Sequence, residues 1–408
     1  MNKYRLAQYA CRLMYFCQAI IINTTPLLFV IFQTQFRVST FELTTLITIM
    51  FGIQLLFDLC SAPVIDKIGY KNSAIISSAV TIVGLLILSA APFYFTDTYF
   101  ALVVATVFLA IGAGSIEVVA SPLGNCLPDT NKNSGMNLLH SFFCWGHLTI
   151  ILFTTGFLTI FDDTLWYLIP LISISVPVLI IVLLAISKID EKKDLIKPDK
   201  IVSPFRDLSF YIMLIMMISA GGLEQAVAQW TSFFAEAGLG VTPDVGNLVG
   251  PAIFALFMAT TRMFFGLKGD KFNPTKTVLY CSIGCIISLA IIIFSPIPLI
   301  SLMACGLIGL FVGALWPTIL TIASQTFPNA GTKLFAAISL FGDVGCIVGP
   351  ALVGGATSIV EKGDFLMPFT KTSVESGLRL GLLLCLVLAV VLFFLTSILL
   401  KRTKKTQK

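Results

Sequence analysis

Two short loops decide the fold of this chain: APVIDKIGYK at residues 62–71 and GLKGDKFNPTK at residues 266–276. In each loop a small residue is followed four positions later by Asp-Lys, first as Ala62 with Asp66 and Lys67, then as Gly266 with Asp270 and Lys271. Each loop follows the second of six apolar stretches. The chain therefore contains an internal repeat that covers two halves of similar length.

The composition around these loops is that of a membrane protein. Of the 408 residues, 57% are hydrophobic and 12% are charged, and the mean hydropathy is +0.96. Soluble globular chains carry about 25% charged residues, so this much apolar surface does not fit a water-soluble core. The composition predicts an all-α membrane protein with many spans.

Twelve stretches are long and apolar enough to cross a bilayer, for which a helix needs about 20 residues. They cover residues 8–33, 41–62, 72–94, 99–126, 135–160, 164–187, 208–236, 244–267, 275–295, 298–326, 332–358 and 376–400. The one long polar break separates the first six from the last six. We therefore expect a six-helix bundle over 1–187, a cytoplasmic linker over 188–207, a second six-helix bundle over 208–400 and a basic cytoplasmic tail over 401–408.

The positive charges predict an orientation, because cytoplasmic loops are enriched in Lys and Arg. With the N-terminus placed in the cytoplasm, the Lys and Arg residues that fall on the outer side are few: Arg37, Lys362, Lys371 and Arg379. We expect a multi-pass protein of the plasma membrane (the inner membrane of a bacterial cell) with both termini cytoplasmic.

No motif predicts a cofactor or an active site. The ten cysteines fall mostly within apolar stretches and form no CxxC, and no His or acid completes a metal set near Cys281 and Cys285. We expect no enzymatic activity, no metal, no cofactor and no nucleic-acid partner. The expected partners are a small solute, H⁺ and the lipid bilayer, and the expected state is a monomer.

The two loops resemble the signature loop of the major facilitator superfamily, G-x-x-x-D-[RK]-x-G-[RK]-[RK], with departures at Ala62, Tyr70 and Asn273. The resemblance implies a transporter built from two pseudo-symmetric six-helix bundles, with the solute site near mid-membrane between them. Helix dipoles favour Asp and Lys at such turns, so we expect the loops to hold the bundles together reversibly on the cytoplasmic side. The gating residues expected are Asp66, Lys67, Gly69, Arg262, Gly266, Asp270 and Lys271, with Asp58 near the same end.

Glu117, in IGAGSIEVVASP at residues 111–122, is the strongest candidate site residue. An ionised acid at the centre of a span costs roughly 2.5–3.5 kcal/mol, so its side chain should face protein or water. The fourth and fifth spans form a hairpin, and counting from its turn places Glu117 level with His140 and His147. Asn137 shares a helical stripe with both histidines. We expect Glu117 to take up a proton or bind solute hydroxyls, with a histidine that adjusts how readily it is protonated. The alternative is a buried Glu–His pair that only locks two helices together.

The seventh span, GGLEQAVAQW at residues 221–230, predicts solute contacts from Glu224, Gln225, Gln229 and Trp230. Amides and carboxylates bind hydroxyls, and aromatic rings stack on the C–H faces of a sugar. The alternative is that these residues only join helices.

Two further groups complete the predicted site. Asp343 stands between glycines in the eleventh span, at a depth like that of His147 in the fifth, so we expect Glu117, His147 and Asp343 to carry the coupled proton. Besides the seventh-span residues, the solute contacts expected are Asn23, Asn137, His140, Trp145 and Trp316. Asn23 lies near Pro26, which removes a helix hydrogen bond and is expected to kink the first span.

Residues 112–142, GAGSIEVVASPLGNCLPDTNKNSGMNLLHSF, resemble the fourth and fifth helices of the fucose–galactose–glucose proton symporter family. In this resemblance Glu117 matches the family's acid, Asn137 its asparagine, and His140 stands at its glutamine, while Ser121 replaces an asparagine. The family's first span also carries a coupling Asp, but here the matching IIINTTPLL has Asn23 and no acid. The resemblance implies proton coupling by Glu117 alone or with another acid; coupling to sodium and uncoupled transport stay open.

The sequence thus predicts a secondary active transporter that works by alternating access and takes up a sugar or similar polar small solute with protons. One alternative is a proton-driven exporter of drugs or metabolites, because the GCIVGP run at residues 345–350 is similar to a glycine motif of antiporters. The other is a membrane sensor that binds a solute without moving it.

Overall fold

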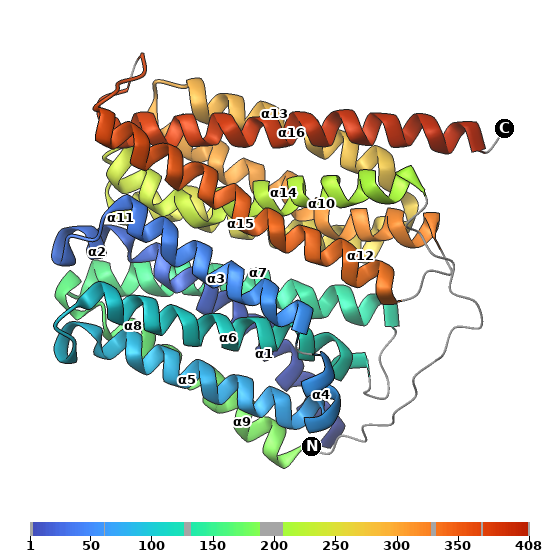
Figure 1. Ribbon diagram of the computed structural model, residues 1–408, viewed down its shortest axis with the longest axis horizontal. Helices are drawn as coiled ribbons and strands as arrows, with labels where there is room; N and C mark the ends of the chain where they lie inside the picture. The colour runs from blue at the N-terminus through green and yellow to red at the C-terminus, as the bar shows by residue number, and fades with distance from the viewer. Residues whose placement is uncertain are drawn as a thin grey trace. The chain divides into compact units, whose positions relative to one another are not determined.

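The computed structural model describes residues 3–60, 62–125, 132–187, 207–327, 332–368 and 370–406 (Figure 1). Within these ranges every regular element is helical and no strand occurs. This confirms the predicted all-α class. The predicted linker lies outside the described residues except for Asp207, whose side chain accepts a hydrogen bond from the Ser209 N–H at 2.8 Å and caps the next helix.

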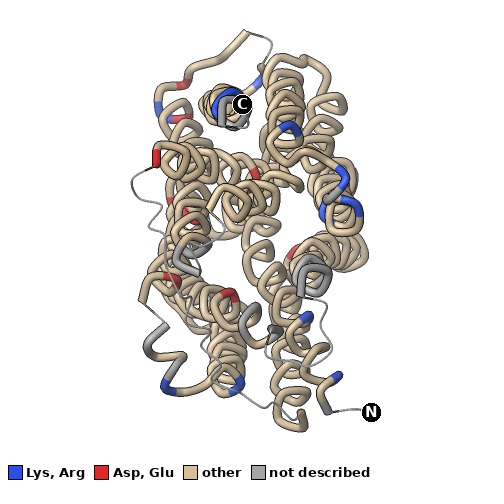
Figure 2. The backbone as a smooth tube through the Cα atoms, turned by 90° about the vertical axis from the view of Figure 1, so that its right-hand side faces the viewer, with Lys and Arg blue, Asp and Glu red and all other residues tan. Residues whose placement is uncertain are grey.

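The chain divides into two compact units, which are Met1–Lys193 with Thr242–Leu248, and Asp194–Val241 with Val249–Lys408. Eleven helical segments in the described residues are long and apolar enough to cross a membrane, and one bent pair brings the number to twelve. Charged residues are sparse along most of the helices, which are tan in Figure 2. Such surfaces fit lipid, where backbone polar groups are satisfied within each helix.

The first unit surrounds one central helix, α6. Its helices are α1 (Lys3–Leu27), α2 (Phe29–Phe36), α3 (Thr40–Cys60), α4 (Ala62–Ile68), α5 (Tyr70–Tyr94), α6 (Thr98–Asn125), α7 (Lys132–Ile160), η1 (Asp163–Leu165), α8 (Leu168–Ser173) and α9 (Ser175–Ile186). Helix α6 contacts α1, α3, α5 and α7. Its side chains are therefore covered on most sides by protein.

In the second unit, α10 takes the central position and contacts α14, α15 and α16. The helices that follow residue 207 in the chain are α10 (Leu208–Phe233), the π-helix η3 (Phe234–Gly238), α11 (Pro243–Asn247), the π-helix η4 (Leu248–Ala252), α12 (Ile253–Lys268), η5 (Gly269–Lys271), α13 (Pro274–Phe294), α14 (Pro298–Thr326), α15 (Thr332–Gly363) and α16 (Ser373–Thr406). Of these, α11 belongs to the first unit. Helix α16 continues through residues 401–406 of the predicted basic tail.

The predicted kink in the first span is present. Helices α1 and α2 are bent by 41° at Leu28, two residues after Pro26. Proline lacks an N–H and its ring crowds the preceding turn, so the helix is interrupted there. The Leu28 N–H bonds to Thr25 O at 3.0 Å, and regular helix resumes at Phe29.

Glycines bring α10 and α15 into backbone contact. A Cβ atom on Gly349 would overlap the carbonyl group of Gly222, and one on Gly345 would overlap the carbonyl of Ile218. Helices approach this closely only where side chains are absent. The glycines of the GCIVGP run therefore have a packing role within the second unit.

Candidate functional site

Glu117 is placed by small residues on its own helix. A Cβ atom on Gly114 of α6 would lie 3.1 Å from the Cα of Gln54 on α3, and one on Gly112 would collide with Thr81 of α5. The glycines let the neighbouring helices pack closely against α6 just before Glu117. The carboxylate therefore projects among protein side chains of the first unit.

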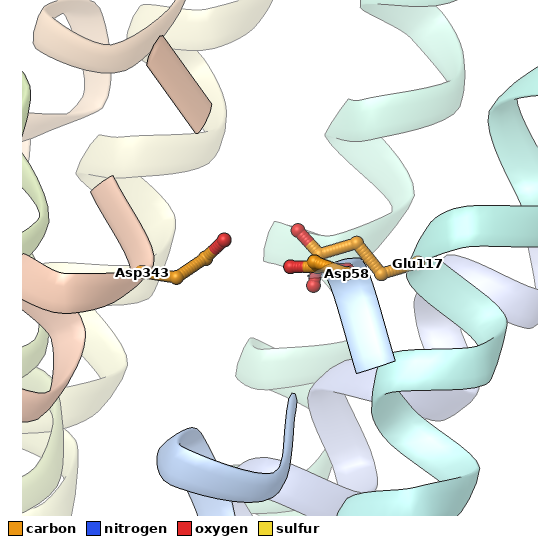
Figure 3. A group of neighbouring side chains, drawn as sticks. All are labelled: Asp58, Glu117 and Asp343. Atoms are coloured by element: carbon orange, nitrogen blue, oxygen red, sulfur yellow. The ribbon is translucent and has the colours of Figure 1, made fainter. Parts of the chain in front are cut away.

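Two glutamines and a second acid surround the Glu117 carboxylate. Gln18 of α1 donates from Nε2 to Glu117 Oε2 at 2.8 Å, and Gln54 of α3 donates from Nε2 to the same oxygen. A carboxylate oxygen of Asp58 lies within 4.8 Å of one of Glu117. Figure 3 shows Asp58 and Glu117, which we call the acid pair, side by side.

This surrounding adds residues that the sequence did not single out for it. The amides of Gln18 and Gln54 hydrogen-bond to the carboxylate, and Asp58, which was assigned to the cytoplasmic end, lies beside it. The role of a histidine at Glu117 stays a prediction. The sequence analysis predicted no role for Gln54. Its spacing from Asp58 is i, i+4, which puts two polar side chains on one face of an apolar helix. That spacing is the sequence signal that could have found them.

The predicted residues of α7 divide into buried and exposed positions. His147 is 2% exposed, next to Gly146, where a Cβ atom would collide with the backbone of Phe16 on α1. His140 is exposed and stacks on Tyr15 of α1, with 4.6 Å between the ring centroids. Trp145 is 36% exposed. The side chain of Asn137 lies outside the described residues.

Asn23 of α1 is buried and bonds within its own helix. Its Nδ2 donates to Ala19 O at 2.8 Å, one turn earlier. This contact holds the amide along the helix next to the bend at Leu28.

In the second unit, Glu224 of α10 and Arg262 of α12 form an ion pair. Arg262 Nη2 donates to Glu224 Oε1 at 3.0 Å and to Oε2 at 2.9 Å. The side chains are 14% and 8% exposed for Arg262 and Glu224 respectively. The sequence analysis assigned Arg262 to gating and Glu224 to solute binding, and the structure joins the two side chains.

The other predicted residues of α10 are buried as well. Gln229 Nε2 donates to Gln225 Oε1 at 3.2 Å, within one turn. Trp230 is 1% exposed and donates from Nε1 to Pro350 O of α15 at 3.0 Å. The indole N–H of Trp230 is therefore used in joining α10 to α15.

Asp343 is buried in α15, 4% exposed. The preceding Gly342 lies against the Trp316 ring of α14, which a Cβ atom at position 342 would overlap. The second unit thus brings Trp316 next to the glycine that precedes Asp343.

The two signature loops end one helix and begin the next. Gly69 has a φ of 86°, a backbone conformation that glycine adopts without strain. Asn273, which departs from the signature, caps α13 by accepting the Lys276 N–H at 3.0 Å. Lys67 and Lys271 are exposed and Gly266 lies within α12. The side chains of Asp66 and Asp270 lie outside the described residues.

A second buried ion pair was not predicted. Arg379 of α16, expected on the outer side, is 1% exposed and pairs with Glu375 at 2.9 Å. It donates from Nη1 to Ile292 O at 2.7 Å and to Ile293 O at 2.9 Å. The guanidinium therefore satisfies the last carbonyls of α13, where a positive charge is favoured by the helix dipole.

Buried acids, amides and ion pairs inside apolar spanning helices define a class, because such residues mark the solute and ion pathways of membrane transporters. A family model described as Major Facilitator Superfamily matches residues 13–350. The chain belongs to this superfamily and is a multi-pass membrane transporter.

Solved structures of the same fold include transporters of several solutes. A D-xylose-proton symporter has a TM-score of 0.76 at 13% identity, covering 96% of each chain. The E. coli fucose:proton symporter has a TM-score of 0.61 at 17% identity, covering 97% of this chain and 99% of its own. The nucleoside transporter NupG has a TM-score of 0.73 at 11% identity, covering 97% and 99%. No curated protein sequence matches. At these identities the likeness shows the fold alone.

Proposed function

We propose that the protein takes up a sugar or a similar polar small solute together with protons, by alternating access, and that Glu117 carries the coupled proton. The observation that supports this most is the surrounding of Glu117, whose carboxylate accepts from two buried amides and has a second acid within 4.8 Å. The solute classes of the xylose and fucose symporters with this fold agree with the proposal.

The chemistry assigned to Glu117 is a change of charge. Protonation makes the carboxyl neutral and able to donate to a solute hydroxyl, and loss of the proton to the cytoplasm weakens that contact and favours release. One charge that moves through about 100 mV supplies about 2.3 kcal/mol. This free energy corresponds to roughly 50-fold accumulation of the solute.

The second unit supplies hydroxyl-binding groups in the proposal. Gln225 and Gln229 carry amides on one face of α10, and Glu224 lies one residue before Gln225. Because Arg262 neutralises Glu224 through two hydrogen bonds, the pair can stay charged within a span. His147 and Asp343 are proposed as further proton carriers, and Asn23, Asn137, His140, Trp145, Trp230 and Trp316 as further solute contacts.

The test is solute-driven alkalinisation in vesicles that contain the purified protein. Adding the transported sugar should take protons from the outer medium, and Glu117→Gln should abolish both this uptake and solute accumulation. Glu361→Gln, which removes a partly exposed carboxylate from α15, is the matched control and should behave as the parent.

Accumulation by Glu117→Gln at the parental level would contradict the proposal. Export of toxic compounds without uptake would favour the exporter. Solute binding without counterflow would favour the sensor.

A further inference from the structure

The acid pair has a buried oxygen acceptor beside it that lacks a donor. Gln54 is 5% exposed, and its Nε2 donates to Glu117 Oε2, so its amide group lies at the pair. Its other polar atom, Oε1, is buried without a hydrogen-bond partner. Buried carbonyl oxygens are almost always paired in folded proteins, so this oxygen indicates a missing donor or cation.

Three oxygen-bearing groups therefore meet at one place in the first unit. Two are the carboxylates of Asp58 and Glu117, which Figure 3 shows together, and the third is the Gln54 carbonyl. Asp58 and Gln54 are one turn apart on α3, and Glu117 comes from α6. Oxygen ligands of this kind suit a proton or a hard metal cation.

The charges around the acid pair favour a bound cation. Helices α1, α3, α5 and α7 pack against α6. Arg12 of α1 lies over two aromatic rings, 5.8 Å from each centroid, and Lys71 of α5 donates to Ser187 O at 3.0 Å. On α7, His140 stacks on Tyr15 and His147 is buried beside Gly146. A carboxylate oxygen of Asp58 lies within 4.8 Å of one of Glu117, so two acidic groups face each other in the first unit.

We propose that Asp58, Glu117 and the Gln54 carbonyl bind one small monovalent cation, H⁺ or Na⁺, and that Asp58 is the second acid of the coupling site. A proton on either carboxyl supplies a donor at the pair, and a sodium ion takes all three oxygens as ligands. One positive charge also removes the repulsion between two carboxylates in a low-dielectric surrounding. Asp58, on the second span, thereby fills the role of the acid that is absent from the first span.

The proposal rests on the proposed function only for the use of the ion in uptake, since binding itself needs no solute. It is tested on the purified full-length protein without sugar. Equilibrium binding of radioactive sodium is measured at two pH values, and infrared difference spectra report the carboxyl stretching band of a protonated acid. The variants are Asp58→Asn, Glu117→Gln and Gln54→Met, and the matched control is Asp364→Asn, an exposed acid at a φ of 47° that asparagine tolerates.

In the sodium arm, the parent binds one sodium ion per chain, in competition with protons, and each of the three variants binds at least roughly tenfold more weakly. In the proton arm, sodium does not bind, and the infrared band of a protonated carboxyl is present in the parent and absent from Asp58→Asn and Glu117→Gln. In both arms Asp364→Asn matches the parent, and unchanged size-exclusion profiles and melting temperatures exclude misfolding.

The proposal is overturned if neither signal is found, or if Asp58→Asn keeps the signal at the parental level. Its failure is distinct from that of the proposed function. If Asp58→Asn retains proton-coupled accumulation that Glu117→Gln loses, the proposed function stands and the three-oxygen site fails. If the ion binds but no solute drives its movement, the site stands and the proposed function fails.

Discussion

Single side chains in this protein bury charge in two different ways. Glu117 accepts hydrogen bonds from neutral donors, the amides of Gln18 and Gln54, and has another acid nearby. Glu224 instead meets a full positive charge on Arg262. An acid held by amides can change protonation without leaving a cation unpaired, whereas an acid in an ion pair cannot. The first arrangement suits a group that titrates, and the second suits a fixed contact.

We predict that breaking the Glu224–Arg262 pair destabilises the protein strongly. Glu224→Gln leaves a guanidinium without its counter-charge, which typically costs about 3–5 kcal/mol. The double variant Glu224→Gln with Arg262→Met should recover much of that loss, because no unpaired charge then stays buried. The free energy of unfolding in detergent measures both effects.

The comparison is the exposed pair between Arg402 and Asp207, where the atoms are 3.7 Å apart and both side chains are about half exposed. Arg402→Gln should change the free energy of unfolding by less than about 1 kcal/mol. A double variant no more stable than Glu224→Gln would show that the pair is not the reason for the loss.

The helices could be predicted from the sequence better than the site could. Apolar length alone places the spans, and Pro26 marks the bend in the first. The prediction ended α15 and α16 where apolar residues end, but α15 runs to Gly363 and α16 to Thr406. Lys and Arg are good helix formers, so polar composition does not stop a helix. The π-helices η3 and η4 carry no sequence signal that we recognise.

The side-chain partners were harder because they depend on how helices cross. Sequence counting gives a depth for Glu117 and His147, but it does not give the direction in which each side chain points. The close approach of α3 and α6 at Gly114 decides that Gln54 and Asp58 reach Glu117. The burial of Arg379 and its pairing with Glu375 were missed for the same reason, because they depend on how α16 packs against the end of α13.

We predict that two glycines of the same helix respond in opposite ways to alanine. Gly349→Ala puts a Cβ atom into the carbonyl of Gly222, so it should lower the free energy of unfolding by about 1–3 kcal/mol. Gly355→Ala has open space around the new methyl group, and it should be neutral or stabilising by up to about 1 kcal/mol. Melting temperatures in detergent compare the two, and equal effects would contradict the glycine-mediated packing of α15 on α10.

At the scale of the whole molecule, the distribution of positive charge predicts how the chain is inserted. Basic residues collect in the loops on one side of the spans, and that side is expected to be cytoplasmic. A fluorescent protein fused after Lys408 should therefore fluoresce, because it folds in the cytoplasm. Alkaline phosphatase inserted after the exposed Asp364 should be active, because it needs the outer side. The reverse pattern would overturn the orientation.

The length of the last helix has a consequence for anything attached to the chain. Helix α16 has 34 residues and is about 50 Å long, whereas the hydrocarbon core of a bilayer is about 30 Å thick. Its basic final turns therefore extend beyond the core as a stiff rod continuous with the second unit. A tag or reporter joined there is held at a set distance and direction from that unit, instead of swinging on a loose tether.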